Sequence, residues 1–194
     1  VIVPFKKKDE DVYFLVWTTT PWTLMANLAL CVNPDLNYVK VDSQGYKFIV
    51  AESLKEKVVG EEAEVLETYK GTELVGTEYE QLLPFVKVEG KAFQVLADNY
   101  VTAEDGTGIV HIAPAYGEDD NRVCRENGIT FVNPVGKDGC YTEGPWKGRL
   151  VTDKELEIDI IKYLKSEDKL FKKIKLTHDY SHCWRCNQPL IFYA

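Results

Sequence analysis

The sequence predicts a mixed α/β fold that is mostly β, with a β-barrel-like core surrounded by helices. Many short runs of β-branched and aromatic residues are separated by Gly, Pro, Asn or Asp, a spacing typical of a closed or sandwiched sheet. Helical spacing of apolar residues is confined to a few segments. The 194 residues are 45% hydrophobic and 28% charged, which fits a single folded domain with a real core.

The first clear strand covers residues 12–17, a continuous apolar and β-prone run that predicts a buried strand. Val1 already lies close to a strand-like stretch. Further runs of the same kind predict strands near residues 28–32, 37–42, 46–51, 64–69, 93–98, 108–113 and 170–176.

Three helices are predicted. Residues 52–58 form a short one stopped by Gly60, and residues 118–127 form a second with Gly128 as its C-terminal cap. The clearest covers residues 153–166. Its start carries a capping-box pattern at Thr152 and Glu155. Its apolar face is formed by Leu156, Ile160, Tyr163 and Leu164.

Charge and cysteine content narrow the class of protein. The net charge of −8 argues against a protein that holds a whole nucleic acid through phosphate contacts. The basic clusters at residues 6–8 and at Lys172, Lys173 and Lys175 are interpreted as solvated lysines. Five cysteines, an odd number without framework spacing, favour reduced thiols and a cytoplasmic location. No apolar run predicts a membrane span, and no secretory signal is recognised.

A run of hydroxyls follows the first strand, in the segment Trp17-Thr-Thr-Thr-Pro-Trp-Thr23. Pro21 pushes Thr20 towards an extended conformation, so we expect the strand to end there in an exposed turn. Thr18 and Thr20 should share one face and Thr19 the other, because side chains alternate along a strand. A row of hydroxyls can hold a carbonyl, a ribose and a water, although threonine in a strand is more commonly structural.

A second string covers residues 106–120, Gly-Thr-Gly-Ile-Val-His-Ile-Ala-Pro-Ala-Tyr-Gly-Glu-Asp-Asp. Its glycines, Gly108 among them, permit a close backbone approach, and the small residues around Ala113 leave room for a ligand. His111 is either a pocket residue or a hydrogen-bonded core histidine. Asp120 is either a partner for a cation or an acidic residue that caps the start of a helix or is favourably placed in its dipole, and Asp119 could cap in its place.

Taken together, the two strings resemble the two halves of the editing pocket in isoleucyl-tRNA synthetases, a class I family. The resemblance implies that Thr18, Thr20, His111 and Asp120 form the catalytic set. Asp120 would pair with the ammonium group of the amino acid, and His111 would limit the size of the pocket. The implied substrate-binding residues are Trp17, Thr19, Trp22, Thr23, Asn27, Gly108, Ala113 and Tyr116.

The resemblance also implies an activity, which is hydrolysis of valine wrongly attached to tRNA(Ile), and possibly of valyl adenylate. The expected partners are the 3′ acceptor end of that tRNA and the rest of a synthetase in cis, with the fragment itself monomeric. Neither string contains a Ser-His-Asp arrangement or a cysteine, so we expect attack by water, no covalent intermediate and no cofactor for editing. The ligase signatures His-x-Gly-His and Lys-Met-Ser-Lys do not occur.

Two alternatives stay open at this stage. One is a non-catalytic module that binds the tRNA acceptor end. The other is an editing domain of the related valyl or leucyl synthetases, in which arginine and an acidic residue usually replace Thr20 and Trp22.

The end of the chain carries a Cys-x-x-Cys pair at Cys183 and Cys186, with His178 and His182 nearby. A structural zinc site needs four ligands, so one pair is half a site. The resemblance implies that residues 1–176 form the editing domain and residues 177–194 return towards the synthetic core. The partner cysteines would lie elsewhere in the full enzyme, which would hold the possible structural zinc.

Overall fold

A computed structural model describes residues 1–174 and 180–194. One curled sheet dominates it, with strand order β6-β4-β5-β2-β8-β3-β7, and β1 pairs with β2 outside this path. The strands are β1 (Ile2–Lys6), β2 (Val12–Trp17), β3 (Ala29–Val32), β4 (Asn37–Ser43), β5 (Tyr46–Ala51), β6 (Glu64–Lys70), β7 (Gln94–Ala97) and β8 (Ile109–Ile112). The predicted class, mixed α/β with mostly strands in a barrel-like core, is confirmed.

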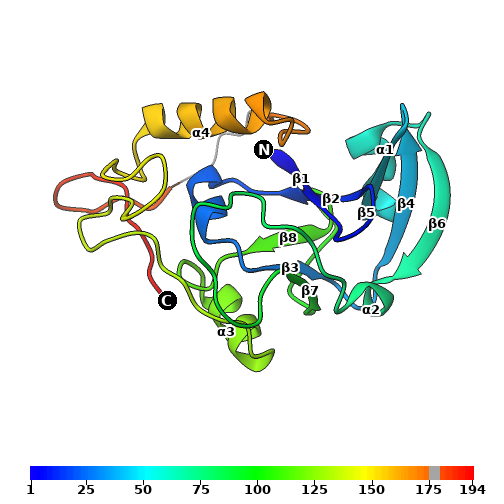
Figure 1. The fold of residues 1–194 in the computed structure, drawn as a ribbon, viewed down its shortest axis with the longest axis horizontal. Helices are drawn as coiled ribbons and strands as arrows, with labels where there is room; N and C mark the ends of the chain where they lie inside the picture. The colour runs from blue at the N-terminus through cyan, green and yellow to red at the C-terminus, as the bar shows by residue number, and fades with distance from the viewer. Residues whose placement is uncertain (175–179) are drawn as a thin grey trace.

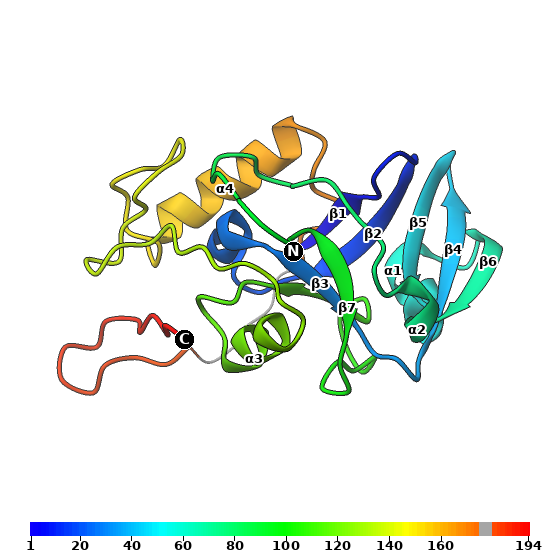
Figure 2. The same cartoon turned by 60° about the horizontal axis from the view of Figure 1, so that its bottom comes forward.

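Helices surround the sheet (Figure 1). They are η1 (Pro21–Ala26), η2 (Glu52–Leu54), α1 (Lys55–Val59), α2 (Gly71–Leu74), α3 (Glu118–Glu126) and α4 (Lys154–Ser166). In Figure 1, α3 and α4 lie on opposite sides of the region formed by β2, β8 and β3, while α1 and α2 lie beside the β4-β5-β6 end. Figure 2 shows the segment after α4 ending in a long loop that projects from the body of the domain.

Strand β2 is the centre of the sheet because it pairs with three neighbours. It runs antiparallel to β1 along its whole length, parallel to β5 at its start, and parallel to β8 at its end, where Trp17 is in register with Val110. Phe14, Leu15 and Val16 are fully buried in this arrangement. The C-terminal ends of β2 and β8 therefore lie next to each other, and this brings the two strings of the sequence together.

Most predicted elements match within one or two residues, and three expectations need correction. Residues after Pro21 form η1, in which every residue is buried, and not an exposed turn, because Trp22, Leu24 and Met25 join the core beside α4. Asp153, and not Thr152, caps α4: its side chain accepts the Glu155 N–H at 3.0 Å. Of the expected strand at 170–176, the described part forms a single bridge between Lys172 and Ile2.

Candidate functional site

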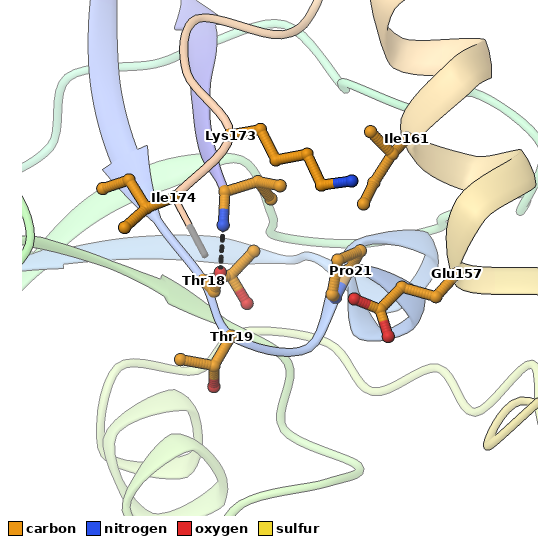
Figure 3. A pocket seen from close by; sticks show the side chains of 8 residues that line it. Thr18, Thr19, Pro21, Glu157, Ile161, Lys173 and Ile174 are labelled. Carbon is orange, nitrogen blue, oxygen red and sulfur yellow. Dashed lines mark hydrogen bonds between the residues drawn. The ribbon is translucent and has the colours of Figure 1, made fainter. Parts of the chain in front are cut away.

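The threonine turn, which we define as residues 18–20, begins directly after β2 ends at Trp17. Thr18 still pairs with Val1 through both backbone groups, at 3.0 Å and 2.8 Å. The next residues leave the strand geometry, and the Thr18 hydroxyl accepts the Thr20 N–H at 3.2 Å. Figure 3 shows a small hollow behind this turn, bounded by Pro21 and by Glu157 and Ile161 of α4. The turn is thus held by Val1, just before β1, and the hollow lies between the turn and α4.

On the other side of the turn, residues from β2, η1, β8 and the start of α3 enclose a larger pocket of about 250 Å³. Both strings contribute to it, although they are far apart in the chain. The pocket is lined by Trp17, Thr18, Thr19, Thr20, Thr23, Val110, His111, Ala113, Tyr116 and Asp120.

All four residues implied to be catalytic therefore share one pocket. Thr19 also lines it, although strand alternation predicted that it faces away; alternation ends with β2 at Trp17, so the expectation does not apply to Thr19. Trp22, by contrast, lines an adjoining hollow with Tyr116. Its ring packs against that of Tyr116, with centroids 4.9 Å apart.

Besides Trp22, two of the implied binding residues, Asn27 and Gly108, are not among the residues that line the pocket. Asn27 is buried behind His111. Gly108 has φ +76°, and a Cβ there would lie 2.5 Å from the Cβ of Ala51. Its carbonyl accepts the Tyr38 hydroxyl at 2.6 Å. Gly108 therefore allows the backbone before β8 to lie close to Ala51 of β5, and it does not form part of the pocket surface.

His111, Thr23 and Thr20 form what we call the His111 wall. The His111 Nε2 lies 2.9 Å from the Thr23 hydroxyl, and its Nδ1 lies 2.8 Å from the Asn27 side-chain amide. Burial lowers the pKa of His111 to about 3, so the ring is neutral at physiological pH. Both ring nitrogens are engaged by protein groups. This geometry leaves the ring without a free basic nitrogen to activate a water.

Asp120 and Ala113 form the opposite side, which we call the Asp120 wall. Asp120 lies in the first turn of α3, and its carboxylate accepts the Ala113 N–H at 2.9 Å. Asp120 does not cap the helix, because Gly117 occupies the N-cap position and no side chain caps this helix, but it does lie in the acidic first turn, as the dipole alternative expected. A Cβ on Gly117 would lie 2.9 Å from the Asp120 Cγ, so a glycine is needed there. Sequence reasoning did not identify Gly117.

Burial raises the pKa of Asp120 to about 6, well above that of an ordinary carboxyl group. Within the described residues, Asp120 forms no ion pair, although Asp119 next to it pairs with Arg122 at 3.3 Å. Asp120 is half-buried, and a carboxylate partly removed from water without a counter-ion is destabilised, a cost that falls when a cation binds. The Asp120 wall is therefore suited to a ligand that carries a positive group.

The terminal cysteine pair lies away from the pocket lining, in the projecting loop. Cys183 donates its N–H to Gln188 at 2.8 Å and accepts that of Asn187 at 2.8 Å, which closes a tight turn. Hydrogen bonds from the Cys186 and Arg185 backbone lower the pKa of the Cys183 thiol. Among the described residues, no three His, Cys, Asp or Glu side chains are grouped to hold a metal ion.

His178 and the expected boundary near residue 176 lie outside the described residues. The half site and the division at this boundary stay predictions. All five cysteines are free. No helix in the described part of the chain is long and apolar enough to cross a membrane.

The chain is similar in sequence to known proteins along nearly its whole length. No protein-family model matches the chain. Isoleucine–tRNA ligases from Clostridium tetani and from Bacillus thuringiensis strain Al Hakam are 46% and 49% identical to it, over 98% and 99% of its length. The chain spans 18% and 19% of those ligases.

Solved structures show the same fold. The crystal structure of GlLeuRS-CP1 matches with a TM-score of 0.66, 16% identity and coverage of 84% of this chain and 85% of that one. The P. knowlesi cytosolic leucyl-tRNA synthetase editing domain matches with a TM-score of 0.65, 12% identity and coverage of 87% and 93%. The resemblance to the editing domain of isoleucyl-tRNA synthetases, inferred from two strings, thus extends along the whole chain in sequence and is matched by its fold.

Proposed function

We propose that the pocket hydrolyses the ester bond between valine and the 3′ end of tRNA(Ile), as the editing domain of an isoleucyl-tRNA synthetase. One observation carries the proposal: a carboxylate that forms no ion pair with any described residue, four threonines and a buried neutral histidine line a single pocket. The similarity to isoleucine–tRNA ligases and the shared fold with the leucyl-tRNA synthetase editing domain support it. The same pocket is proposed for valyl adenylate, which carries the same amino acid.

Binding begins at the Asp120 wall. The α-ammonium group of the aminoacyl ester pairs with the Asp120 carboxylate, which relieves the cost of leaving that charge buried and alone. This contact fixes the amino acid at its nitrogen, so the ester carbonyl is directed towards the Thr18 hydroxyl and the side chain towards the His111 wall. Placing the reacting groups in this way supplies much of the catalysis.

Water is the nucleophile in this proposal. The residues that line the pocket include no cysteine or serine, and His111 has no free basic nitrogen. The threonine hydroxyls orient the water and the ester. As the water attacks, the ester carbon becomes tetrahedral, the bond to the ribose oxygen breaks, and that oxygen takes up the proton that the water loses. The products are free valine and intact tRNA.

Selectivity comes from the His111 wall. Isoleucine carries one methylene more than valine, and forcing a methylene into a packed site costs about 1–3 kcal/mol. Hydrogen bonds hold His111 at both nitrogens, so the wall resists the displacement that the larger side chain would require. The pocket would accept valine and exclude isoleucine.

A deacylation assay tests the proposal. The chain is mixed with valyl-tRNA(Ile) and, separately, with isoleucyl-tRNA(Ile), and release of the amino acid is measured. We expect hydrolysis of the valyl ester only, and hydrolysis of both esters by His111→Ala. A chain that binds the valyl-tRNA without hydrolysing it would replace the proposal with the non-catalytic binding module. The remaining expectations, the synthetase in cis as partner and a cytoplasmic location, belong to the same proposal.

A further inference from the structure

We infer that Tyr79 is a positioning residue of this site, which acts through Asn27 to fix the protons of His111 and of the threonines beside it. The inference rests on the proposed function for its effect on catalysis. Tyr79 belongs to neither string and lies 52 residues from Asn27, yet its hydroxyl donates to the Asn27 side-chain oxygen at 2.6 Å. It is outside the pocket lining, and it is buried between Phe5 and Phe93 with ring centroids 5.4 Å and 5.9 Å away.

The orientation of the Asn27 amide is fixed by its neighbours. Its nitrogen lies 3.0 Å from the Ala29 carbonyl oxygen, which can only accept a hydrogen bond, so this atom must be the NH₂ group. Its oxygen then faces Tyr79, whose hydroxyl donates to it. The same NH₂ group donates its second proton to the His111 Nδ1 at 2.8 Å. Nδ1 is therefore unprotonated, and the proton of the neutral ring is on Nε2.

The threonines lead to the same assignment from the opposite direction. The Thr23 hydroxyl has one proton, which it donates to the Thr20 carbonyl at 2.8 Å. Thr23 must therefore accept from the His111 Nε2 at 2.9 Å and from the Thr20 hydroxyl at 3.0 Å. Two independent sets of contacts thus place the histidine proton on Nε2.

The last member of the chain is the one that reaches substrate. Because the Thr20 hydroxyl gives its proton to Thr23, only its lone pairs remain to face the pocket. Thr20 then accepts hydrogen bonds from a water, a ribose hydroxyl or an ammonium group, and donates none. Tyr79 reinforces this polarity from within the core, because its donation, together with the Ala29 carbonyl, holds the Asn27 amide in the orientation that the rest of the chain requires.

The test uses Tyr79→Phe, which keeps the ring packing and removes one buried hydroxyl. Tyr38→Phe is the matched control: it also loses a fully buried hydroxyl, one that donates to Gly108 outside the pocket lining. Nitrogen NMR of ¹⁵N-histidine-labelled protein distinguishes a protonated from an unprotonated ring nitrogen. The chain has 3 histidines, so a His111→Gln spectrum assigns the signals.

We expect the native protein and Tyr38→Phe to show His111 protonated on Nε2 alone. Tyr79→Phe leaves the Ala29 and threonine contacts in place, so the Nε2-protonated ring should remain the major form, with a detectable fraction protonated on Nδ1. It should also lower kcat for valyl-tRNA(Ile) by about fivefold to tenfold, the effect of one hydrogen bond, and leave KM unchanged because Asp120 still binds the ammonium group. A second variant, Asn27→Asp, replaces the donor with an acceptor and should place a proton on Nδ1.

A pure Nε2-protonated ring in either variant would overturn the inference, as would an equal loss of kcat in Tyr79→Phe and Tyr38→Phe. If the native protein hydrolyses no valyl-tRNA, the proposed function fails, and the NMR arm still decides whether Tyr79 sets the protons of the site.

Discussion

The His111 wall and the Asp120 wall enclose the same pocket but handle their polar groups differently. In the His111 wall, each side chain is bonded to another, in a chain that reaches back to Asn27 in the core. In the Asp120 wall, a carboxylate bonded to the Ala113 N–H faces the pocket without an ion-pair partner among the described residues. Burial makes His111 neutral and makes Asp120 harder to ionise.

This difference separates two tasks. A wall whose hydrogen bonds are already made keeps its shape when a ligand enters, so it can discriminate by size. A wall with an unneutralised charge gains most when a cation arrives, so it can supply binding energy. Substitutions should therefore affect binding on one side and shape or stability on the other.

The largest effect is expected for Asp120→Asn. Loss of the carboxylate removes a buried partner for the ammonium group, which costs about 2–5 kcal/mol, and kcat/KM for valyl-tRNA(Ile) should fall at least about 30-fold. The same change should raise the melting temperature at pH 7.5, because it removes a charge that burial disfavours. Asp119→Asn, at an exposed carboxylate, is the control and should keep near-native activity. Equal losses in both variants would contradict the separation of tasks.

Of the two walls, only the Asp120 wall should affect the pH dependence of kcat/KM. Because the pKa of Asp120 is raised to about 6, the carboxyl is protonated below that pH and cannot pair with the ammonium group. We expect kcat/KM to rise about tenfold per pH unit up to about pH 6. It should fall again above about pH 8, where an α-amino group loses its proton. His111 does not contribute, because its pKa of about 3 lies below this range.

The same pKa has a consequence for stability with the opposite sign. A folded-state pKa above the unfolded value means that folding favours the protonated carboxyl, so this group's contribution is full at about pH 4 and is lost as the pH rises through about 6. The unfolding free energy of the native protein should therefore decline across this window relative to that of Asp120→Asn.

For the pH profile of activity, an acidic limb that persists in Asp120→Asn would show that a group other than Asp120 causes that limb.

A smaller effect is expected in the His111 wall from Thr23→Val, which keeps the shape and removes the hydroxyl. It leaves the His111 Nε2–H and the Thr20 hydroxyl without their acceptor, so the free energy of unfolding should fall by about 1–3 kcal/mol. Urea unfolding measures this change. Thr19→Val, at an exposed threonine, should stay within about 0.5 kcal/mol of the native value.

The sequence predicted the Asp120 wall and the threonine turn better than the network behind them. Local pattern was enough for β2, β8 and α3, because their apolar runs and turn residues are contiguous. The buried 3-10 helix was missed because Pro21 also fits an exposed turn, and only packing against α4 decides between the two. The expected face of Thr19 was wrong for a similar reason: the strand ends at Trp17, as predicted, but its alternation does not continue through Thr18–Thr20.

The roles of Asn27 and Tyr79 could not come from local pattern. Asn27 was expected at the pocket wall and lies behind it, and Tyr79 matches no motif. Their contact depends on how the segment before β7 pairs with the end of β1 and with Phe93. Residue spacing in the sequence does not predict this pairing. Hydrogen-bonded groups that support a site from the core are therefore found only in three dimensions.

The smallest effect is expected in a third region, the terminal cysteine turn formed by residues 183–188. Its two cysteines are fewer than the ligands of a complete metal site. Cys183 and Cys186 would supply two of the four ligands that a structural zinc requires, and among the described residues no group of three or more possible ligands forms. We expect the isolated chain to bind zinc weakly and below one ion per molecule, and a chelator to leave both deacylation and the melting temperature unchanged. Elemental analysis and thermal unfolding with and without EDTA measure these effects, and Cys183→Ser with Cys186→Ser is the matched variant. One tightly bound zinc per chain would show that the 194 residues supply all the ligands. The cysteine turn would then resemble the His111 wall, in which the protein itself supplies the partners of the polar groups.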